Sequence, residues 1–104
     1  MLTVSQGDYG YAITDTLEDS NGTAFDLSNY TVKLHTWIPG RPDKLIVNAN
    51  ATVISNAAGT VSYTVKVGDF TYMGIVNAEW EATKANVKQS FPTSSFQIEV
   101  VESA

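Results

Sequence analysis

The sequence contains no cysteine, and this absence removes several classes of site at once. Disulfide frameworks and thiolate metal sites are excluded. No apolar run approaches the roughly 20 residues that a membrane-spanning helix needs. The first eight residues have neither the basic region nor the apolar region of a secretory signal. We therefore expect a soluble protein that is made in a cytoplasm.

Positive charge is also scarce. Six Lys and Arg residues stand against 11 Asp and Glu residues, which gives a formal net charge of -5 and a pI of about 4.5. Nucleic-acid binding requires a basic surface, and anionic lipid repels an acidic one. The charge balance therefore predicts neither a nucleic-acid partner nor a membrane partner.

What the chain does have is strand-like alternation, clearest in residues 74–84. There Val76, Ala78, Trp80 and Ala82 share one face, and polar residues occupy the other. This pattern is typical of an antiparallel strand with one face on a core and one in water. Trp80 is the largest apolar side chain of that face, so we expect the other strands to pack around it.

Similar segments cover most of the chain and are separated by turn-forming residues. They span residues 2–5, 9–17, 30–38, 45–54, 60–67 and 88–101, and 45–54 is either one long strand or two joined by a kink. Chain length and this spacing predict a single domain over residues 1–104, an all-β, Ig-like antiparallel β-sandwich of about seven to nine short strands. The first and last strands are candidates for sheet edges.

The alternation also assigns side chains to the core. We expect Trp80, Val61, Tyr63, Leu34 and Ile98 to be buried. Val67 should point inward with Val61 and Tyr63. Asp15 shares an inward face with apolar residues, so it either lies near a sheet edge, caps a neighbouring loop or makes a polar contact at an interface.

No group of residues predicts catalysis. His35 is the only histidine, and without cysteine it makes a zinc site improbable. Glu79 and Glu81 are neighbours on one strand face, where a solvated polar surface explains them better than a hydrolytic pair. The acidic residues of the N-terminal quarter contain no calcium-loop motif. We expect no enzyme activity, no cofactor and no metal.

His35 and Trp37 lie on the face opposite the core set of their strand, just before the loop that contains Arg41. Such an aromatic pair can anchor a protein interface, stack on sugars as in a carbohydrate-binding module, or be covered by the loop at 39–43. The sequence leaves all three open, and the candidate interface residues are His35, Trp37, Arg41 and Asp15.

Short motifs follow one another in a specific order along the chain. They are Gly7-Asp8, Leu17-Glu18-Asp19-Ser20-Asn21-Gly22, Phe25-Asp26-Leu27-Ser28, Thr31-Val32-Lys33-Leu34, residues 49–54, Gly59-Thr60-Val61-Ser62-Tyr63, Gly68-Asp69, Gly74, Ala78-Glu79-Trp80-Glu81-Ala82 and Phe91-Pro92. Their order and spacing resemble the N-terminal domain of the phage baseplate upper protein family, an Ig-like β-sandwich of phages that infect Gram-positive bacteria.

The resemblance implies a non-enzymatic structural module of the virion, made in the host cytoplasm. It would dock through protein–protein contacts on other phage structural proteins, in multiple copies and with a possible homo-oligomer on the particle. Family members usually continue into a helical stalk, whereas this sequence ends at Glu102-Ser103-Ala104. Besides tail or baseplate attachment, that leaves a capsid decoration or head-fibre base. A carbohydrate-binding module is the alternative from a different class.

Overall fold

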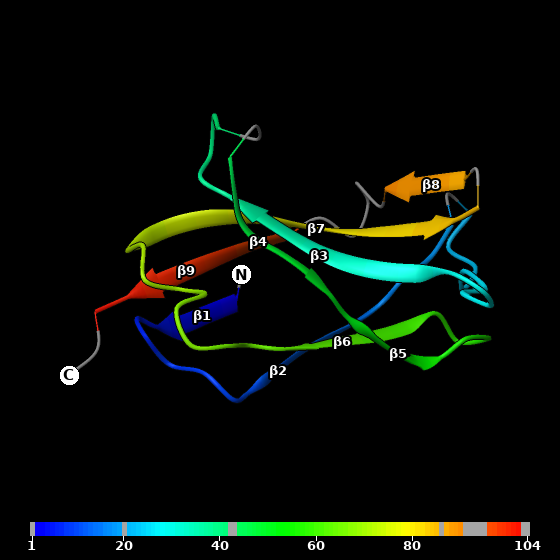
Figure 1. Cartoon of the computed structure of the whole chain (residues 1–104), viewed down its shortest axis with the longest axis horizontal. Helices are drawn as coiled ribbons and strands as arrows, with labels where there is room; N and C mark the ends of the chain where they lie inside the picture. Colours follow the sequence, from blue (N-terminus) through cyan, green and yellow to red (C-terminus); the bar gives the residue numbers. More distant parts are fainter. Residues whose placement is uncertain (1, 20, 42–43, 86, 91–95, 103–104) are drawn as a thin grey trace.

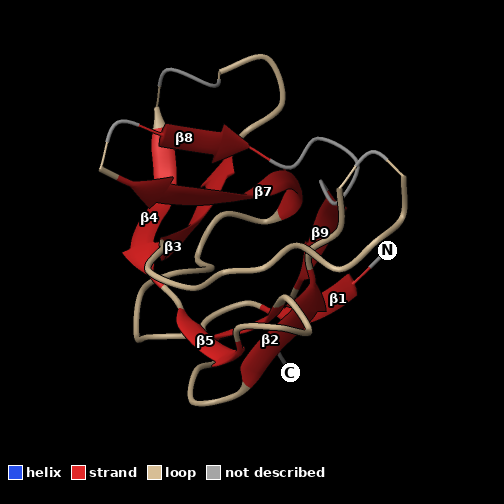
Figure 2. Ribbon diagram, turned by 90° about the vertical axis from the view of Figure 1, so that its right-hand side faces the viewer, coloured by secondary structure: helices blue, strands red, loops and turns tan. Residues whose placement is uncertain are grey.

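The computed structural model of the chain describes residues 2–19, 21–41, 44–85, 87–90 and 96–102. The described residues form nine β-strands and no helix, arranged in two sheets (Figure 1). The prediction of an all-β sandwich with seven to nine short strands is confirmed. Turned by 90°, the molecule shows β2 and β5 in one layer and β3, β4 and β7 in the other (Figure 2).

The larger sheet is built around β7. Its strand order is β1 (Leu2–Ser5), β9 (Phe96–Val101), β7 (Gly74–Lys84), β3 (Thr31–Trp37) and β4 (Leu45–Asn50), and β8 (Val87–Ser90) also pairs with β7. The smaller sheet consists of β2 (Ala12–Thr16), β6 (Thr60–Thr64) and β5 (Thr52–Ser55), with β6 in the middle.

Strand β7 has the boundaries that its alternation predicts. One edge of β7 pairs along its length with β3, and Leu34 lies opposite Trp80. The other edge is shared, because β9 pairs with its first half and β8 with its second half. Val76, Ala78, Trp80 and Ala82 are all buried, as predicted from sequence.

The C-terminal segment differs from its prediction. Instead of one strand over 88–101 it forms β8 and β9. Proline interrupts a strand, so Pro92 predicts a break in this segment, and its position lies outside the described residues. The expectation that the last strand is an edge is wrong, since β1 pairs with the outer side of β9. That pair is parallel, so the sandwich is not purely antiparallel. Only β1 lies at an edge there.

The segment 45–54 forms two strands, which resolves the alternative left open by its sequence. The chain leaves the larger sheet after Asn50 and enters the smaller one at Thr52. Ala51 donates its backbone N–H to the carbonyl of Val32 (2.8 Å) at the crossing. Four residues earlier in the chain, within β4, the buried Thr36 hydroxyl accepts the N–H of Val47 (3.0 Å), beside an irregularity in the β3–β4 register. The side chain thus satisfies a backbone donor.

Two further local predictions can be compared with the structure. The Asn21-Gly22 pair stands between two extended segments and so predicts a hairpin. It does lie in a tight turn, but the flanking segments meet in a single bridge between Glu18 and Ala24 rather than in a two-stranded hairpin. The prediction that Val67 points inward is wrong. β6 ends at Thr64, and Val67 is 73% exposed because it belongs to the loop that follows.

One apolar cluster fills the space between the sheets. Trp80, Leu34, Val61 and Ile98 are fully buried, and Tyr63 is 2% exposed. Phe70 and Leu27, which come from loops, also belong to the cluster. In the short connection over residues 25–29, the sequence places Phe25 and Leu27 where they can plug the end of the core. In the structure Phe25 packs against the cluster and Leu27 lies within it.

Candidate functional site

The outer face of the larger sheet carries His35 in a small ionic group. Its Nδ1 lies 3.8 Å from a carboxylate oxygen of Glu81, and Lys88 Nζ lies 3.5 Å from the same oxygen. The Glu81 side chain is only 15% exposed, so it is more covered than the solvated face expected from sequence. The group links β3, β7 and β8, and its Lys88–Glu81 pair, with Lys88 mostly exposed, contributes at most about 1 kcal/mol.

Trp37 is half-buried on the same face. It lines a shallow hollow of about 290 Å³ together with Glu79, Asn77 and Gln97. Arg41 lies in the following loop, where its backbone N–H bonds to the carbonyl of Ile38 (2.9 Å). Sugar binding by stacking requires flat exposed aromatics, and the described aromatics that are most exposed, Tyr9 and Tyr72, lie in loops rather than on β3. No observation here favours a carbohydrate-binding module.

Asp15 lies on the smaller sheet, so the structure does not bring it together with His35, Trp37 and Arg41. Its Oδ2 accepts the indole N–H of Trp80 (3.1 Å), and its Oδ1 accepts the N–H of Thr16 (2.8 Å). A fully buried tryptophan needs an acceptor for its N–H, and Asp15 provides one from the opposite sheet. This contact explains an acidic residue on an inward face.

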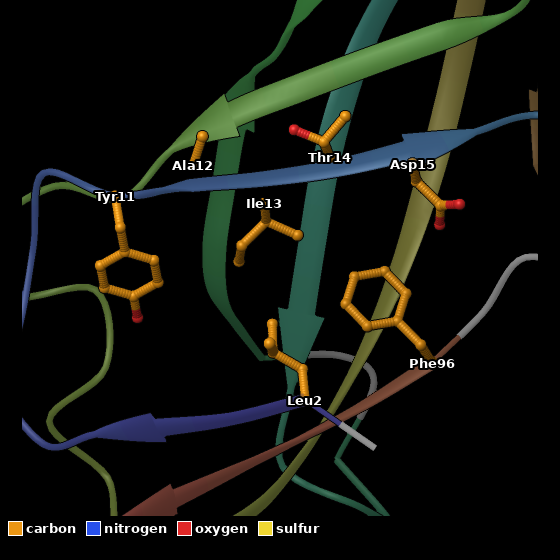
Figure 3. Close-up of a pocket in the computed structure, with 7 residues that line it drawn as sticks. All are labelled: Leu2, Tyr11, Ala12, Ile13, Thr14, Asp15 and Phe96. Atoms are coloured by element: carbon orange, nitrogen blue, oxygen red, sulfur yellow. The ribbon is translucent and has the colours of Figure 1, made fainter.

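A pocket of about 410 Å³ opens between the two sheets, on the side where β1 and β2 are the outermost strands. We call it the edge pocket. In Figure 3, Tyr11, which directly precedes β2, points toward Leu2 and Phe96, and so do Ile13 and Asp15 of β2. Ala12 and Thr14 point away. The sequence did not predict this pocket, because it depends on how far the two sheets overlap.

Tyr11 lies deep on this side. Its hydroxyl oxygen is buried and has no hydrogen-bond partner among the described residues. Burial raises the pKa of Tyr11, and the nearby charges of Asp8 and Asp69 raise it further. The hydroxyl therefore keeps its proton, and its unpaired position makes this side of the sandwich the less completely packed one.

Tyr63 of β6 shows the opposite arrangement. Its hydroxyl donates to Asp69, whose carboxylate also accepts the N–H of Lys66 (2.9 Å). Burial raises the pKa of Tyr63, and the hydrogen bond to Asp69 and its charge add to the rise. The three residues hold the loop after β6 against the sheet. This gives Gly68-Asp69, one of the motifs singled out in the sequence, a structural role.

Exposed apolar side chains gather in two loops at one end of the sandwich. The loops are joined by hydrogen bonds from Gly7 N–H to the Phe70 carbonyl (3.0 Å) and from Gln6 Nε2 to the Thr71 carbonyl (2.8 Å). We call the following four exposed residues of these loops the end patch: Tyr9, Val67, Tyr72 and Met73. Large exposed apolar side chains of this kind are typical of protein contact sites.

The acidic residues near the N-terminus are bound locally. Asp19 accepts the N–H groups of Asn21 (2.9 Å) and Thr23 (3.0 Å). Asp26 accepts the N–H and hydroxyl of Ser28, and these bonds lower the pKa of Asp26.

Over the part of the chain that the structure describes, no three His, Asp or Glu side chains are grouped so as to hold a metal ion. The same part has no helix long and apolar enough to cross a bilayer.

Comparison with known proteins identifies the family. The family model described as the BppU N-terminal domain, where BppU is the phage baseplate upper protein, matches residues 2–104. The chain belongs to this family. The resemblance inferred from the motif order is thereby confirmed, and the chain is a structural component of a phage virion. No curated protein matches the sequence.

The fold agrees with that assignment. The solved structure titled "N-terminal domain of phage TP901-1 ORF48" superimposes with a TM-score of 0.75. The match covers 96% of this chain and 83% of the other, at 14% sequence identity. At this identity the likeness concerns the fold alone, and it shows that the two-sheet arrangement persists when most side chains differ.

Proposed function

We propose that this BppU_N domain is a non-enzymatic, Ig-like module that docks through protein–protein contacts in the phage baseplate, in several copies per particle. The observation that carries the proposal is the family match over residues 2–104. It favours the baseplate over a capsid decoration or head-fibre base. The module would be made in the host cytoplasm and would enter the virion during assembly.

The end patch is the first surface that we assign to docking. Tyr9 is 62% exposed and Val67 is 73% exposed, although both are large apolar residues. Aromatic residues and methionine are enriched at protein interfaces, and their burial stabilises a complex by removing apolar area from water. A neighbouring baseplate protein, or a second copy of this chain, would cover them.

The outer face of the larger sheet supports a second contact. There the side chain of His35 lies beside Glu81, and Trp37 lines a hollow with Glu79 of the same neighbouring strand. Arg41 follows in the loop after β3. Mixed aromatic and charged surfaces of this type suit the rim of an interface. We assign Asp15 to the opposite side of the molecule, where it acts with the edge pocket.

Mass spectrometry of purified phage particles tests the proposal. We expect this chain in gradient-purified virions at a constant ratio to other baseplate proteins. A particle-free fraction of the same lysate is the control. Absence of the chain from mature virions, with abundant chain in the particle-free fraction, would show that it is not a virion component.

A matched pair of substitutions tests the end patch. Val67→Ser removes an exposed apolar side chain from the patch, whereas Ile54→Ser removes one from β5, where Ile54 is 59% exposed. Both proteins should keep their melting temperature, since neither side chain is buried. We expect Val67→Ser alone to lower incorporation into particles. Equal incorporation of both variants would exclude the patch as a docking surface.

A further inference from the structure

We propose that the outer edge of β2 accepts an extended segment of another polypeptide as an added strand. The segment would present apolar side chains to the edge pocket at alternate positions and a Lys or Arg beside Asp15. The proposal deepens the docking function by naming the form of the partner. It is tested on the isolated protein, so it can fail while the virion assignment succeeds.

The first observation is the direction of the backbone groups of β2. Among the residues that the structure describes, this strand pairs only with β6, and no described strand lies beside its other edge. The Tyr11 carbonyl and the Leu17 N–H both bond toward the β6 side, to Val65 (2.9 Å) and Gly59 (2.8 Å). Because antiparallel bonding alternates, the backbone groups of Ala12 and Thr14 point away from β6.

These groups make a short template for another strand. The N–H of Thr16 is taken by the Asp15 carboxylate, so the available stretch ends at Thr14. Residues 11–15 of the same strand region line the edge pocket. The unpaired backbone and the apolar hollow therefore coincide over the same residues, which is the arrangement that strand addition uses for affinity and specificity.

The second observation is the unequal width of the sheets. Asp15 of β2 accepts the indole N–H of Trp80 on β7 across the sandwich, and β9 and β1 follow β7 outward in the larger sheet. Among the described residues no strand of the smaller sheet lies beyond β2, so we infer that part of the inner face of β9 and β1 is uncovered. Leu2 on β1 faces inward yet is 39% exposed, and Phe96 on β9 is only partly buried. Figure 3 shows both side chains directed into the gap opposite Ile13. A fourth strand beside β2 would cover them.

Charge indicates the chemistry of the added segment. The chain has no Lys or Arg before Lys33, while Asp8 and Glu18 flank β2 and Asp15 lies within it. Exposed edges are commonly protected by Lys or Pro, and β2 has neither. An uncharged strand gains nothing from these carboxylates, whereas a basic residue beside the strand is attracted to them. The acidic edge thus selects a basic, alternating segment.

A second copy of this chain fits the edge less well. Two β2 strands paired about a two-fold axis would bring both β1 strands, which extend past the smaller sheet, into the same space. They would also bring two acidic edges together. A single added strand avoids both the overlap of two β1 strands and the repulsion between two acidic edges. We therefore assign the edge to a segment of a different protein.

The test uses the synthetic peptide Lys-Val-Thr-Val-Thr-Val-Lys with the full chain. Amide hydrogen exchange by NMR should show slow exchange for Ile13 and Asp15 and fast exchange for Ala12 and Thr14 in the free protein. Millimolar peptide should slow exchange of Ala12 and Thr14 by at least about tenfold. Unchanged rates at those two amides, or protection confined to Thr3 and Ser5 of β1, would overturn the proposal.

Two controls separate strand addition from unspecific binding. Peptides N-methylated on all Thr or on all Val residues block opposite edges of the added strand, so one should lose binding and the other keep it. Equal binding of both would contradict an edge pairing. On the protein, Thr14→Pro removes the outward N–H without touching the β6 ladder and should abolish binding, whereas Thr14→Val should retain it.

Self-association provides the last arm of the test. Exchange of Ala12 and Thr14 should not depend on protein concentration when peptide is absent. Protection that grows with protein concentration would show that a second copy occupies the edge, and would overturn the assignment to a foreign segment.

Discussion

The chain passes from one sheet to the other four times, and two of these crossings, β4–β5 and β1–β2, leave different surfaces. On one side, β4 and β5 form an almost continuous strand that changes sheets at Ala51. The bonds from Ala51 to Val32 and from Val47 to Thr36 satisfy its backbone. On the other side, residues 6–11 join β1 to β2, and the edge pocket lies between these strands.

The two sides of the sandwich differ in how completely they are packed, so we expect one to contribute more to stability and the other to be available for docking. At the β4–β5 crossing and in β4 the backbone N–H groups of Ala51 and Val47 have acceptors. The β1–β2 side holds the Tyr11 hydroxyl, which has no partner among the described residues, and Leu2, which is 39% exposed. Apolar surface that stays in water contributes nothing to folding and becomes available for binding. We therefore expect substitutions on the β4–β5 side to change stability, and equivalent substitutions on the β1–β2 side to change it much less.

The largest contrast should come from two Leu→Ala substitutions. Leu34 on β3 is fully buried between Ala49 and Trp80, so Leu34→Ala should cost about 2–5 kcal/mol of unfolding free energy. Leu2→Ala, at the mouth of the edge pocket, should cost less than about 1 kcal/mol. Urea denaturation of both variants measures the difference. Equal losses would show that the β1–β2 side is packed as tightly as the centre.

A buried hydroxyl on the β4–β5 side provides the next contrast. Thr36→Val keeps the volume but leaves the N–H of Val47 without its acceptor, and should cost about 2 kcal/mol. Thr36→Ser keeps the hydroxyl and should therefore lower the unfolding free energy by less than Thr36→Val does. Thr14→Val on the outer edge of β2 should stay within about 0.5 kcal/mol of the unmodified chain. Chemical denaturation of the three variants measures these losses. An unchanged unfolding free energy for Thr36→Val would contradict the predicted order.

The two inward tyrosines make a closer comparison. Tyr63→Phe removes the hydrogen bond to Asp69 and should cost about 1.5 kcal/mol. Tyr11→Phe removes a buried hydroxyl that has no partner among the described residues, so stability should be unchanged or slightly higher. Thermal unfolding of both variants, monitored by circular dichroism, measures this. A larger loss for Tyr11→Phe would reverse the assignment.

The smallest effect concerns alkaline pH. Burial and the Asp69 contact raise the folded-state pKa of Tyr63 above its ordinary value of about 10. Since the unfolded chain releases that proton first, stability should be complete below about pH 10 and fall as pH rises further. Tyr63→Phe should flatten this fall more than Tyr11→Phe. Urea midpoints between about pH 8 and 11 measure the slopes, and a rise in stability over that range would contradict the sign.

Sequence reasoning succeeded where local alternation decides structure. The boundaries of β1 and β7 follow from it, and so does the outward direction of His35 and Trp37 on β3. It failed for Val67, where alternation continued past the end of β6 and the chain turned into a loop. Alternation indicates which side chains suit a strand, but it does not indicate at which residue the pairing with a neighbouring strand ends.

Features that depend on contacts between residues far apart in the chain could not be predicted from the sequence. The bond between Asp15 and Trp80 joins residues 65 positions apart in opposite sheets. The parallel pairing of β1 with β9, which removes β9 from the edge, depends on strands at the two ends of the chain. The edge pocket follows from that pairing, because it extends the larger sheet past β2. The family resemblance indicated a structural role in the virion, and the strand pairing is the basis of the docking surface that we propose.

Cryo-EM of purified phage particles tests the central claim most directly. We predict density for this BppU_N domain in the baseplate, with the end patch covered and an extended segment of a neighbouring protein beside Ala12 and Thr14. A particle in which the domain is present but the outer edge of β2 faces solvent would contradict the strand-addition proposal. A baseplate without the domain would contradict the docking function itself.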